Sequence, residues 1–324
     1  MSLQASATSS AFIWRRVHSL TGLWLVLYLI IHLVTNSQAA LWIGEDGVGF
    51  IRLVNLLESL PYLVLIETFL IGVPFLLHII WGIKRALDAK FNPWPNQGKN
   101  PSLGYLRNWN YTLQRLSSWI LLVGVIGHVI QMRFLHVPTE VPSTIGTQYF
   151  VKLRFDEGLY TLAARLGVTL LTTKDQAAAR LLLQQSSFPP ASFEERKTYN
   201  EEERVKRVMY QNLQEDRIWL ETFTQQSLHA DQVLAMAPKP GTAFLLMVRD
   251  IFKSPFYAVL YTIFVIASAF HAFNGFWTFL LTWGLILSYR SQNRLFPIGV
   301  IGMIGLTLLG CAAIWCSYWV NLRT

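Results

Sequence analysis

The sequence predicts an all-α membrane protein, a bundle of five transmembrane helices with a large extramembrane insert between the third and fourth helices. Of its 324 residues, 52% are hydrophobic and 14% are charged, whereas soluble domains carry about 25% charged residues. The apolar residues gather in five stretches, each long enough for the roughly 20 residues that cross a bilayer core. Between the third and fourth stretches the composition becomes strongly polar.

Each apolar stretch is expected to be a helix, because a single segment in lipid must satisfy its own backbone hydrogen bonds. The expected spans are Val17–Leu41, Tyr62–Ile83, Thr112–Met132, Phe256–Leu287 and Leu295–Val320. The chain therefore divides into residues 1–135 with three spans, an insert at 136–253, and residues 254–324 with two spans.

The net charge of +8 does not indicate a nucleic-acid partner, because the positive charges follow the ends of the spans. They are Arg15, Arg16, Lys84, Arg85, Lys90, Lys99, Arg107, Arg115, Arg290 and Arg294. The positive-inside rule makes the N-terminus and the second-to-third and fourth-to-fifth loops cytoplasmic. The insert and the C-terminus are then expected outside, in a multi-pass protein of a bacterial cytoplasmic membrane.

The insert is expected to fold as a small α or α+β domain. Val151–Phe155 alternates like a short strand, and an amphipathic helix is expected at Ala243–Phe252. Further helical stretches are Asp156–Leu166, Lys174–Gln185 and Glu194–Leu228, with a proline break at Ser187–Ser192. A second amphipathic stretch, Gly49–Leu60, lies in the first outer loop.

Four histidines lie inside four different apolar stretches, at nearly the same depth from the start of each. They are His32, His78, His128 and His271. An ionisable residue in hydrocarbon is expensive, so each is a functional-site hypothesis by default. Imidazole is the usual protein ligand to haem iron, and four imidazoles suffice for two haems.

Helix direction sorts these histidines into pairs. Each follows the start of its span by 15 or 16 residues, about 22–24 Å at 1.5 Å per residue. Since successive spans run in opposite directions, His32 and His128 meet in the outer half and His78 and His271 in the inner half. The two irons are then expected about 15 Å apart along the membrane normal.

The remaining histidines, the cysteines and the fifth span are expected to have structural roles. His18 and His136 lie near the interfaces and do not share the depth of the four span histidines, and His229 is expected to be a surface residue. Cys311 and Cys316 read as packing residues, and no Cys-x-x-Cys-His occurs for covalent haem attachment. The fifth span carries glycines but no histidine, so it is expected to pack closely over the bundle.

At these residues the chain resembles a known family, the di-haem, five-helix cytochrome b anchor of succinate:quinone oxidoreductases, of the cytochrome b558 type. The matching stretches are Arg15–Gly22, Ile31–Leu33, Glu58–Pro61, Leu76–His78, Arg107–Trp109, Gln114–Arg115, Gly127–Val129, Phe270–Trp277 and Thr282–Gly284. The resemblance covers all five spans in order. The chain departs from it at about residues 140–240, where the family usually has a short loop.

The resemblance implies a function and partners. A flavoprotein and an iron–sulfur subunit of succinate dehydrogenase would dock on the basic cytoplasmic face. The chain itself would have no succinate site. It would pass electrons through two b-type haems to a quinone, expected to be menaquinone, within the respiratory chain and the tricarboxylic acid cycle. Succinate oxidation and fumarate reduction use the same parts.

The resemblance also implies site residues. The four histidines match the haem ligands with the same pairing, and Ser19 with His18 matches the region that binds inner-haem propionates. Arg16 and Arg115 are inner-face cations that either pair with propionates or anchor the topology. Glu58 matches an acidic position beside the menaquinone site.

Glu67, inside the second span, is the other candidate for proton exchange with the quinone. A helix-to-helix hydrogen bond is the alternative interpretation of this carboxylate.

Two alternative functions stay open at this point. A formate dehydrogenase or hydrogenase anchor, or a quinol:fumarate reductase anchor, shares the two-haem bundle and is separated by its partner subunits. A transporter whose histidines relay protons is separated by ion flux without haem.

Overall fold

The computed structural model describes residues 10–40, 46–88, 106–186, 201–320 and residue 323, with the side chains of 106–108 left out. These residues form two compact units. Unit 1 comprises residues 1–38, 59–130 and 255–314, and unit 2 comprises residues 39–58, 131–254 and 315–324. The predicted break at Ser187–Ser192, and Lys90 and Lys99, lie outside the described residues.

The five predicted spans are confirmed as helices long and apolar enough to cross a membrane. Within the described residues they are Ser10–Ser37, Leu63–Asp88, Trp109–Leu135, Pro255–Thr282 and Tyr289–Val320. The chain is therefore a multi-pass membrane protein that is largely helical. Several helices extend beyond the predicted spans, since a helix does not end where the hydrocarbon core does.

The fourth span is shorter than predicted. Helix α10 (Pro255–Thr282) ends five residues before Leu287. The amide of Trp283 still donates to the Phe279 carbonyl, and Gly284 then adopts φ +71°. A glycine in this left-handed conformation is a usual helix stop because it has no Cβ to clash.

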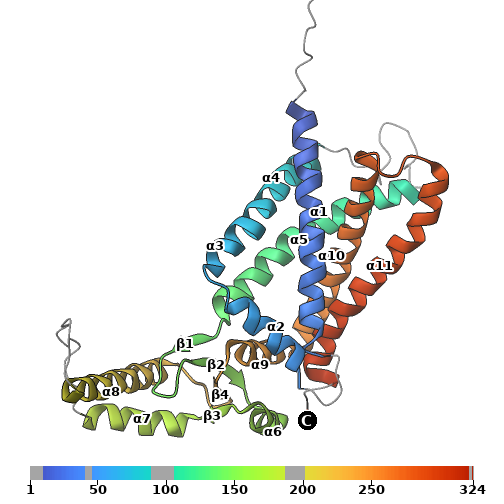
Figure 1. Ribbon diagram of the computed structural model, residues 1–324. Helices are drawn as coiled ribbons and strands as arrows, with labels where there is room; N and C mark the ends of the chain where they lie inside the picture. The colour runs from blue at the N-terminus through green and yellow to red at the C-terminus, as the bar shows by residue number, and fades with distance from the viewer. Residues whose placement is uncertain (1–9, 41–45, 89–105, 187–200, 321–322, 324) are drawn as a thin grey trace, which may run out of the picture. The chain divides into compact units, whose positions relative to one another are not determined.

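Unit 1 holds four helices in a closed ring (Figure 1). Helix α1 (Ser10–Ser37) packs against α4 (Val73–Asp88) and α10, and α5 (Leu106–Val129) packs against α10 and α4. Ring neighbours run antiparallel, so α1 and α5 are diagonal to one another, as are α4 and α10. Each of these four helices carries one of the four histidines.

A proline shapes the second span. Its first part is α3 (Leu63–Glu67) and a π-helical segment, η1 (Thr68–Gly72), which leads into α4. Pro74 has no backbone N–H, so it cannot donate to the carbonyl of Leu70 four residues earlier. The indole N–H of Trp24 on α1 donates to that carbonyl at 2.6 Å instead. The irregular segment is thereby tied to the neighbouring helix.

The fifth helix, α11 (Tyr289–Trp315), approaches α10 closely at two of its glycines. A Cβ at Gly310 would lie 2.5 Å from Cγ1 of Val265, and a Cβ at Gly299 would meet the ring of Phe273. Gly302 and Gly305 have no such neighbour within 4 Å. Close packing therefore depends on the first and last glycines of the series.

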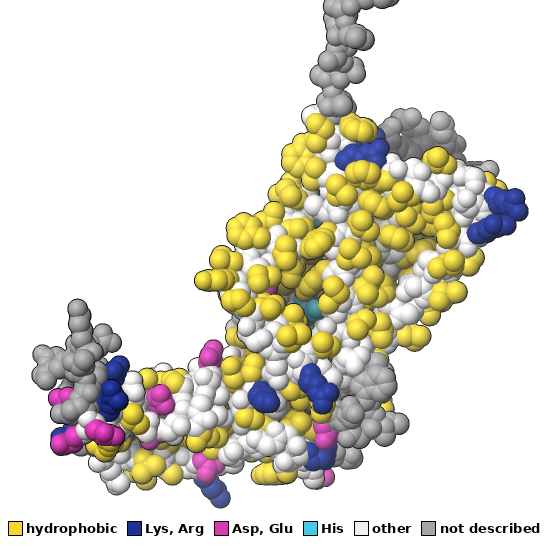
Figure 2. Space-filling view, in the orientation of Figure 1, with side chains coloured by type: hydrophobic (Ala, Val, Ile, Leu, Met, Phe, Trp, Pro, Cys, Tyr) yellow, Lys and Arg dark blue, Asp and Glu magenta, His cyan; other side chains and the backbone are white. Residues whose placement is uncertain are grey.

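Large apolar side chains cover the outside of the helical unit. Ile31, Val123 and Ile301 are each more than 60% exposed, and Figure 2 shows hydrophobic side chains across the visible face of α1, α10 and α11. Exposed apolar surface on this scale is not found on soluble monomers. It fits a surface that faces lipid.

Unit 2 is built on a four-stranded antiparallel sheet in the order β1-β2-β4-β3. The strands are β1 (Thr139–Val141), β2 (Gln148–Arg154), β3 (Thr169–Leu171) and β4 (Gln232–Ala237). The predicted strand at 151–155 overlaps β2, and the other three strands were not predicted. The insert has an α+β arrangement.

Helices accompany the sheet. They are α2 (Val48–Glu58), α6 (Glu157–Leu166), α7 (Thr173–Gln185), α8 (Glu201–Gln225) and α9 (Pro240–Phe252). The core beside α7 and α8 is Val141, Phe150, Ala179, Phe223 and Leu234. Helix α9 packs against β2, β4 and α2. The first turn of α9 approaches α2 so closely that a Cβ at Gly241 would overlap the backbone of Ile51.

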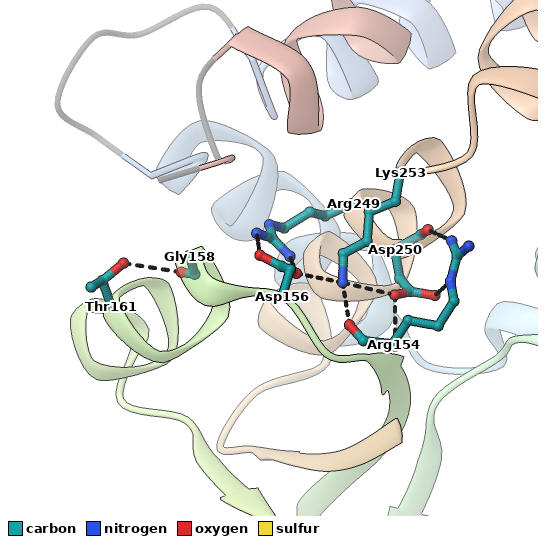
Figure 3. A network of polar contacts seen from close by, with 7 residues as sticks. All are labelled: Arg154, Asp156, Gly158, Thr161, Arg249, Asp250 and Lys253. Carbon is teal, nitrogen blue, oxygen red and sulfur yellow. Dashed lines mark hydrogen bonds and ion pairs between the residues drawn. The ribbon is translucent and has the colours of Figure 1, made fainter. Parts of the chain in front are cut away.

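A network of ion pairs joins the end of β2 to α9 (Figure 3). Both guanidinium NH groups of Arg249 donate to Asp156, at 2.8 and 2.7 Å. The ammonium of Lys253 lies 2.6 Å from Asp156 and 3.0 Å from Asp250, and also donates to the Arg154 carbonyl. Lys253 thus has an acceptor for each of its three protons, so the network is internally satisfied.

Two aromatic residues of η3 (Cys316–Val320) lie against the same helix. The ring of Tyr318 lies 5.0 Å from the guanidinium carbon of Arg249, and the indole N–H of Trp319 donates to the Phe252 carbonyl at 2.9 Å. Residues from three separate stretches of the chain therefore complete unit 2.

Candidate functional site

The four span histidines meet in two pairs across the bundle. His32 on α1 and His128 on α5 have ring centroids 5.9 Å apart, with the ring planes at 87°. His78 on α4 and His271 on α10 have centroids 6.3 Å apart, with planes at 79°. Both pairs lie on the diagonals of the helix ring, so both bridge its interior.

Three of these imidazoles have a partner for their Nδ1 atom. Nδ1 of His78 faces the His18 carbonyl at 3.2 Å. Nδ1 of His271 faces the Ser117 hydroxyl at 3.3 Å, and Nδ1 of His128 faces the Tyr261 hydroxyl at 3.3 Å. A proton on Nδ1 leaves Nε2 as the lone-pair nitrogen, the usual arrangement of a metal-ligating histidine.

The residues present fit a bis-histidine haem at each pair. Metal–nitrogen bonds of about 2.0 Å, with each nitrogen about 1.1 Å from its ring centre, separate two axial imidazole centroids by about 6 Å. Gly22 leaves room for one ring, since a Cβ there would lie 3.0 Å from Cε1 of His78. Among the described residues no cluster of three or more His, Cys, Asp or Glu suits a metal ion.

His18 lies closer to this site than the sequence suggested. Its ring stacks on His78 with centroids 4.0 Å apart and planes at 14°. Within the described part of the chain, its buried Nδ1 has no hydrogen-bond partner. An unpartnered donor here fits an acidic group such as a haem propionate. The sequence carried a signal for this placement, because His18 and His32 are 14 residues apart, nearly four full helical turns, and so lie on one face of their helix.

Arg16 and Ser19 are held together with the end of α10. The Arg16 guanidinium donates to the Thr282 carbonyl at 2.9 Å and lies 4.6 Å from the ring of Trp283. The Trp283 indole donates to the Ser19 hydroxyl at 3.2 Å. Arg115 lies on α5, with its guanidinium 5.6 Å from the ring of Tyr111 on the same helix.

Polar residues that the sequence reasoning missed surround His271. The Asn274 amide donates to Gln114 at 3.0 Å, and the Gln114 amide donates to the His271 carbonyl at 3.4 Å. A spacing signal existed for Ser117. It precedes His128 by 11 residues, about three turns, so both lie on one face of α5. Tyr261 offered no comparable signal.

One curated relative matches the chain. It is the succinate dehydrogenase cytochrome b558 subunit of Bacillus subtilis (strain 168), 31% identical over 177 residues. The match covers 49% of this chain and 82% of the relative.

The chain belongs to the succinate dehydrogenase cytochrome b558 family.

No family model and no solved structure matches it. As a member of this family, the chain is a cytochrome b membrane subunit of a succinate dehydrogenase.

The two acidic candidates of this family member fall in different units. Glu58 is the last residue of α2 in unit 2, and Glu67 is the last residue of α3 in unit 1. Burial raises the pKa of Tyr149, and the negative charges of Glu140 and Glu58 raise it further. Glu58 therefore has an acidic and phenolic neighbourhood within unit 2.

Glu67 has a different setting. It directly precedes the π-helical segment η1, and it acts electrostatically on Tyr28 of α1. π-Helical segments inside α-helices are frequent at functional sites.

An apolar cavity of about 350 Å³ lies between α1 and α4 in the same unit. Its lining is Leu20, Thr21, Leu23, Trp24, Leu27 and Pro74. The Thr21 hydroxyl at its edge lies 3.5 Å from Nδ1 of His78. The cavity is shallow and open, and its lining is almost wholly apolar.

Proposed function

We propose that this family member is the di-haem anchor of a succinate:quinone oxidoreductase and carries electrons from the iron–sulfur subunit to a quinone. Two b-type haems would accept and release single electrons when bound. His32 with His128 would hold one, and His78 with His271 the other. The protein's part is to bind, orient and tune these groups.

The observation that carries the proposal is the diagonal placement of the two histidine pairs. Each pair joins two non-adjacent helices across the interior, where an uncoordinated imidazole gains little and costs desolvation. Because the helices alternate in direction, the pairs fall toward opposite ends of the bundle. This arrangement supports two sites in series.

Residues near the inner pair are proposed to hold the haem's propionates. His18 offers its unpartnered Nδ1, and Arg16 and Ser19 lie on the same end of α1. Arg115 is the remaining cation proposed for this role. A charge-assisted bond from a cation to a carboxylate is about twice as strong as a neutral one, so these groups would fix the orientation of the porphyrin.

Quinone reduction needs a group that exchanges protons, and Glu58 and Glu67 are the proposed residues. Glu58 is favoured as the donor, with menaquinone as the expected quinone. The apolar cavity beside Thr21 supports an alternative binding place nearer the inner pair. Variants Glu58→Gln and Glu67→Gln distinguish them, because only the working group should slow turnover without lowering the haem content.

The proposed orientation follows from charge. The N-terminus and basic loops would face the cytoplasm, where Arg85, Arg290 and Arg294 support docking of the iron–sulfur and flavoprotein subunits. The insert and the C-terminus would lie outside the bacterial cytoplasmic membrane. Lipid is then the remaining partner, and nucleic acid is not expected.

The experiment is haem counting on the complex purified through this chain. Wild type should show a bis-histidine b-type spectrum with two haems per chain, and His128→Ala or His271→Ala should each lower the count to one. His136→Ala is the matched control, since its Nδ1 contacts the Gln131 carbonyl at 3.0 Å on its own helix. A folded wild-type chain without haem refutes the proposal.

The same preparation identifies the complex. Co-purification of a flavoprotein and an iron–sulfur protein with succinate-reducible haem supports the succinate dehydrogenase assignment. A molybdenum or hydrogenase subunit in their place would instead favour a formate dehydrogenase or hydrogenase anchor.

A further inference from the structure

The hydrogen-bond partners of the histidine rings differ from one pair to the other. In the His78–His271 pair, the partners are the His18 carbonyl and the hydroxyls of Thr21 and Ser117. In the His32–His128 pair, the Nδ1 of His128 faces the phenol of Tyr261 at 3.3 Å. Tyr28 also lies against His32, with ring centroids 5.6 Å apart, but among the described hydrogen bonds only that of Tyr261 joins a phenol to one of these four histidines.

The contact lies inside unit 1. Tyr261 is 8% exposed, and it comes from α10, whereas His128 comes from α5. The two rings have centroids 5.7 Å apart with planes at 69°. The phenol therefore reaches His128 from a neighbouring helix of the ring and is shielded from the surroundings.

A third ring fixes this geometry. Phe264, one turn after Tyr261, has its ring centroid 6.1 Å from that of His128 and 6.1 Å from that of Tyr261. Gly124 on α5 leaves the space for it, because a Cβ there would lie 2.5 Å from Cδ2 of Phe264. The orientation of His128 is set by packing as well as by the hydrogen bond.

We propose that Tyr261 is a positioning residue for His128 and lowers the reduction potential at the His32–His128 site. The inference rests on the proposed function. With Nε2 on iron, the ring carries its proton on Nδ1 and donates it to the phenol oxygen. This bond makes the imidazole a more basic ligand. A more basic ligand favours the oxidised, more positive iron, so the potential falls.

The test is a redox titration of the purified complex carrying Tyr261→Phe, which removes one oxygen atom and keeps the ring. Both haems should remain, and one of the two midpoint potentials should rise while the other stays. A tenfold change in the reduction equilibrium, the expected upper size, is 59 mV for a one-electron couple.

The matched control is Tyr289→Phe, the same change on α11, where the side chain is 72% exposed. It should move neither potential. Electron paramagnetic resonance of the oxidised protein gives a second reading, since a freed His128 ring should shift the g values of one haem.

Two outcomes distinguish a failure of this inference from a failure of the proposed function. If Tyr261→Phe leaves both potentials and both resonance signals unchanged with two haems bound, the inference is wrong and the proposed function stands. If the wild-type complex carries no haem, the proposed function itself is wrong.

Discussion

Removal of the Arg249 guanidinium should cost unit 2 about 3 kcal/mol of stability. The Arg249 side chain is 1% exposed and donates two hydrogen bonds to Asp156. Arg249→Met keeps an unbranched apolar stem while deleting the guanidinium and its charge. Breaking a buried ion pair by removing one partner costs about 3–5 kcal/mol. The lower figure applies because Lys253, 2.6 Å from Asp156, still neutralises the carboxylate.

Hydrogen exchange followed by mass spectrometry measures this loss on the intact chain in detergent. Amides of β2 and α9 that exchange through opening of unit 2 should exchange about a hundredfold faster, since each 1.4 kcal/mol is about tenfold. Lys206→Met on α8 is the control. It breaks an exposed pair with Glu202 at 2.7 Å, and such pairs contribute about 0–1 kcal/mol.

A double-mutant cycle decides whether the ion pair is the cause. Asp156→Asn combined with Arg249→Met should cost less than the sum of the two single changes, because the second change no longer strands a charge. An Arg249→Met protein that exchanges like Lys206→Met, or strictly additive losses in the cycle, would refute the reasoning.

Three further outcomes are expected. Burial raises the pKa of Asp156, but the hydrogen bonds from Arg249 and Lys253 lower it by more, so the net shift of the pKa is downward. The stabilisation from Asp156 is therefore complete above about pH 4 and is lost as the pH falls through the lowered pKa. Acid-induced unfolding of Asp156→Asn should lack this loss. Gly124→Ala should displace Phe264 and lower thermal stability by about 1–3 kcal/mol, whereas Gly127→Ala, with nothing within 4 Å, should be neutral in the same melts. Gly241→Ala should speed proteolysis of unit 2, because its Cβ would overlap backbone atoms of α2.

The membrane helices were predictable from the sequence because their determinant is local. A run of apolar residues of sufficient length specifies a span without knowledge of its neighbours. The boundaries were less predictable, since Gly284 ends α10 through its conformation rather than its polarity. The strands β1, β3 and β4 were missed because short strands are defined by distant partners, such as the pairing of Leu170 with Ala235.

The histidines of the candidate site were visible in the sequence, but their partners were not. The depth of each histidine along its span follows from its residue number alone, so the matched depth of the four histidines could be predicted. The contact between His128 and Tyr261 depends on how α5 and α10 rotate against each other. The stacking of His18 on His78 depends on the approach of α1 to α4. Such rotations are decided by packing, including glycines such as Gly22.

The discontinuous make-up of unit 2 has a consequence for biosynthesis. Its residues are synthesised in three separate stretches, and the last, residues 315–324, begins at the end of the fifth span. Until then Arg249 lacks the ring of Tyr318, and the Phe252 carbonyl lacks the Trp319 indole. Unit 2 can therefore be completed only after all five spans have been synthesised. A chain stalled earlier would present an unfinished domain to proteases and quality-control machinery.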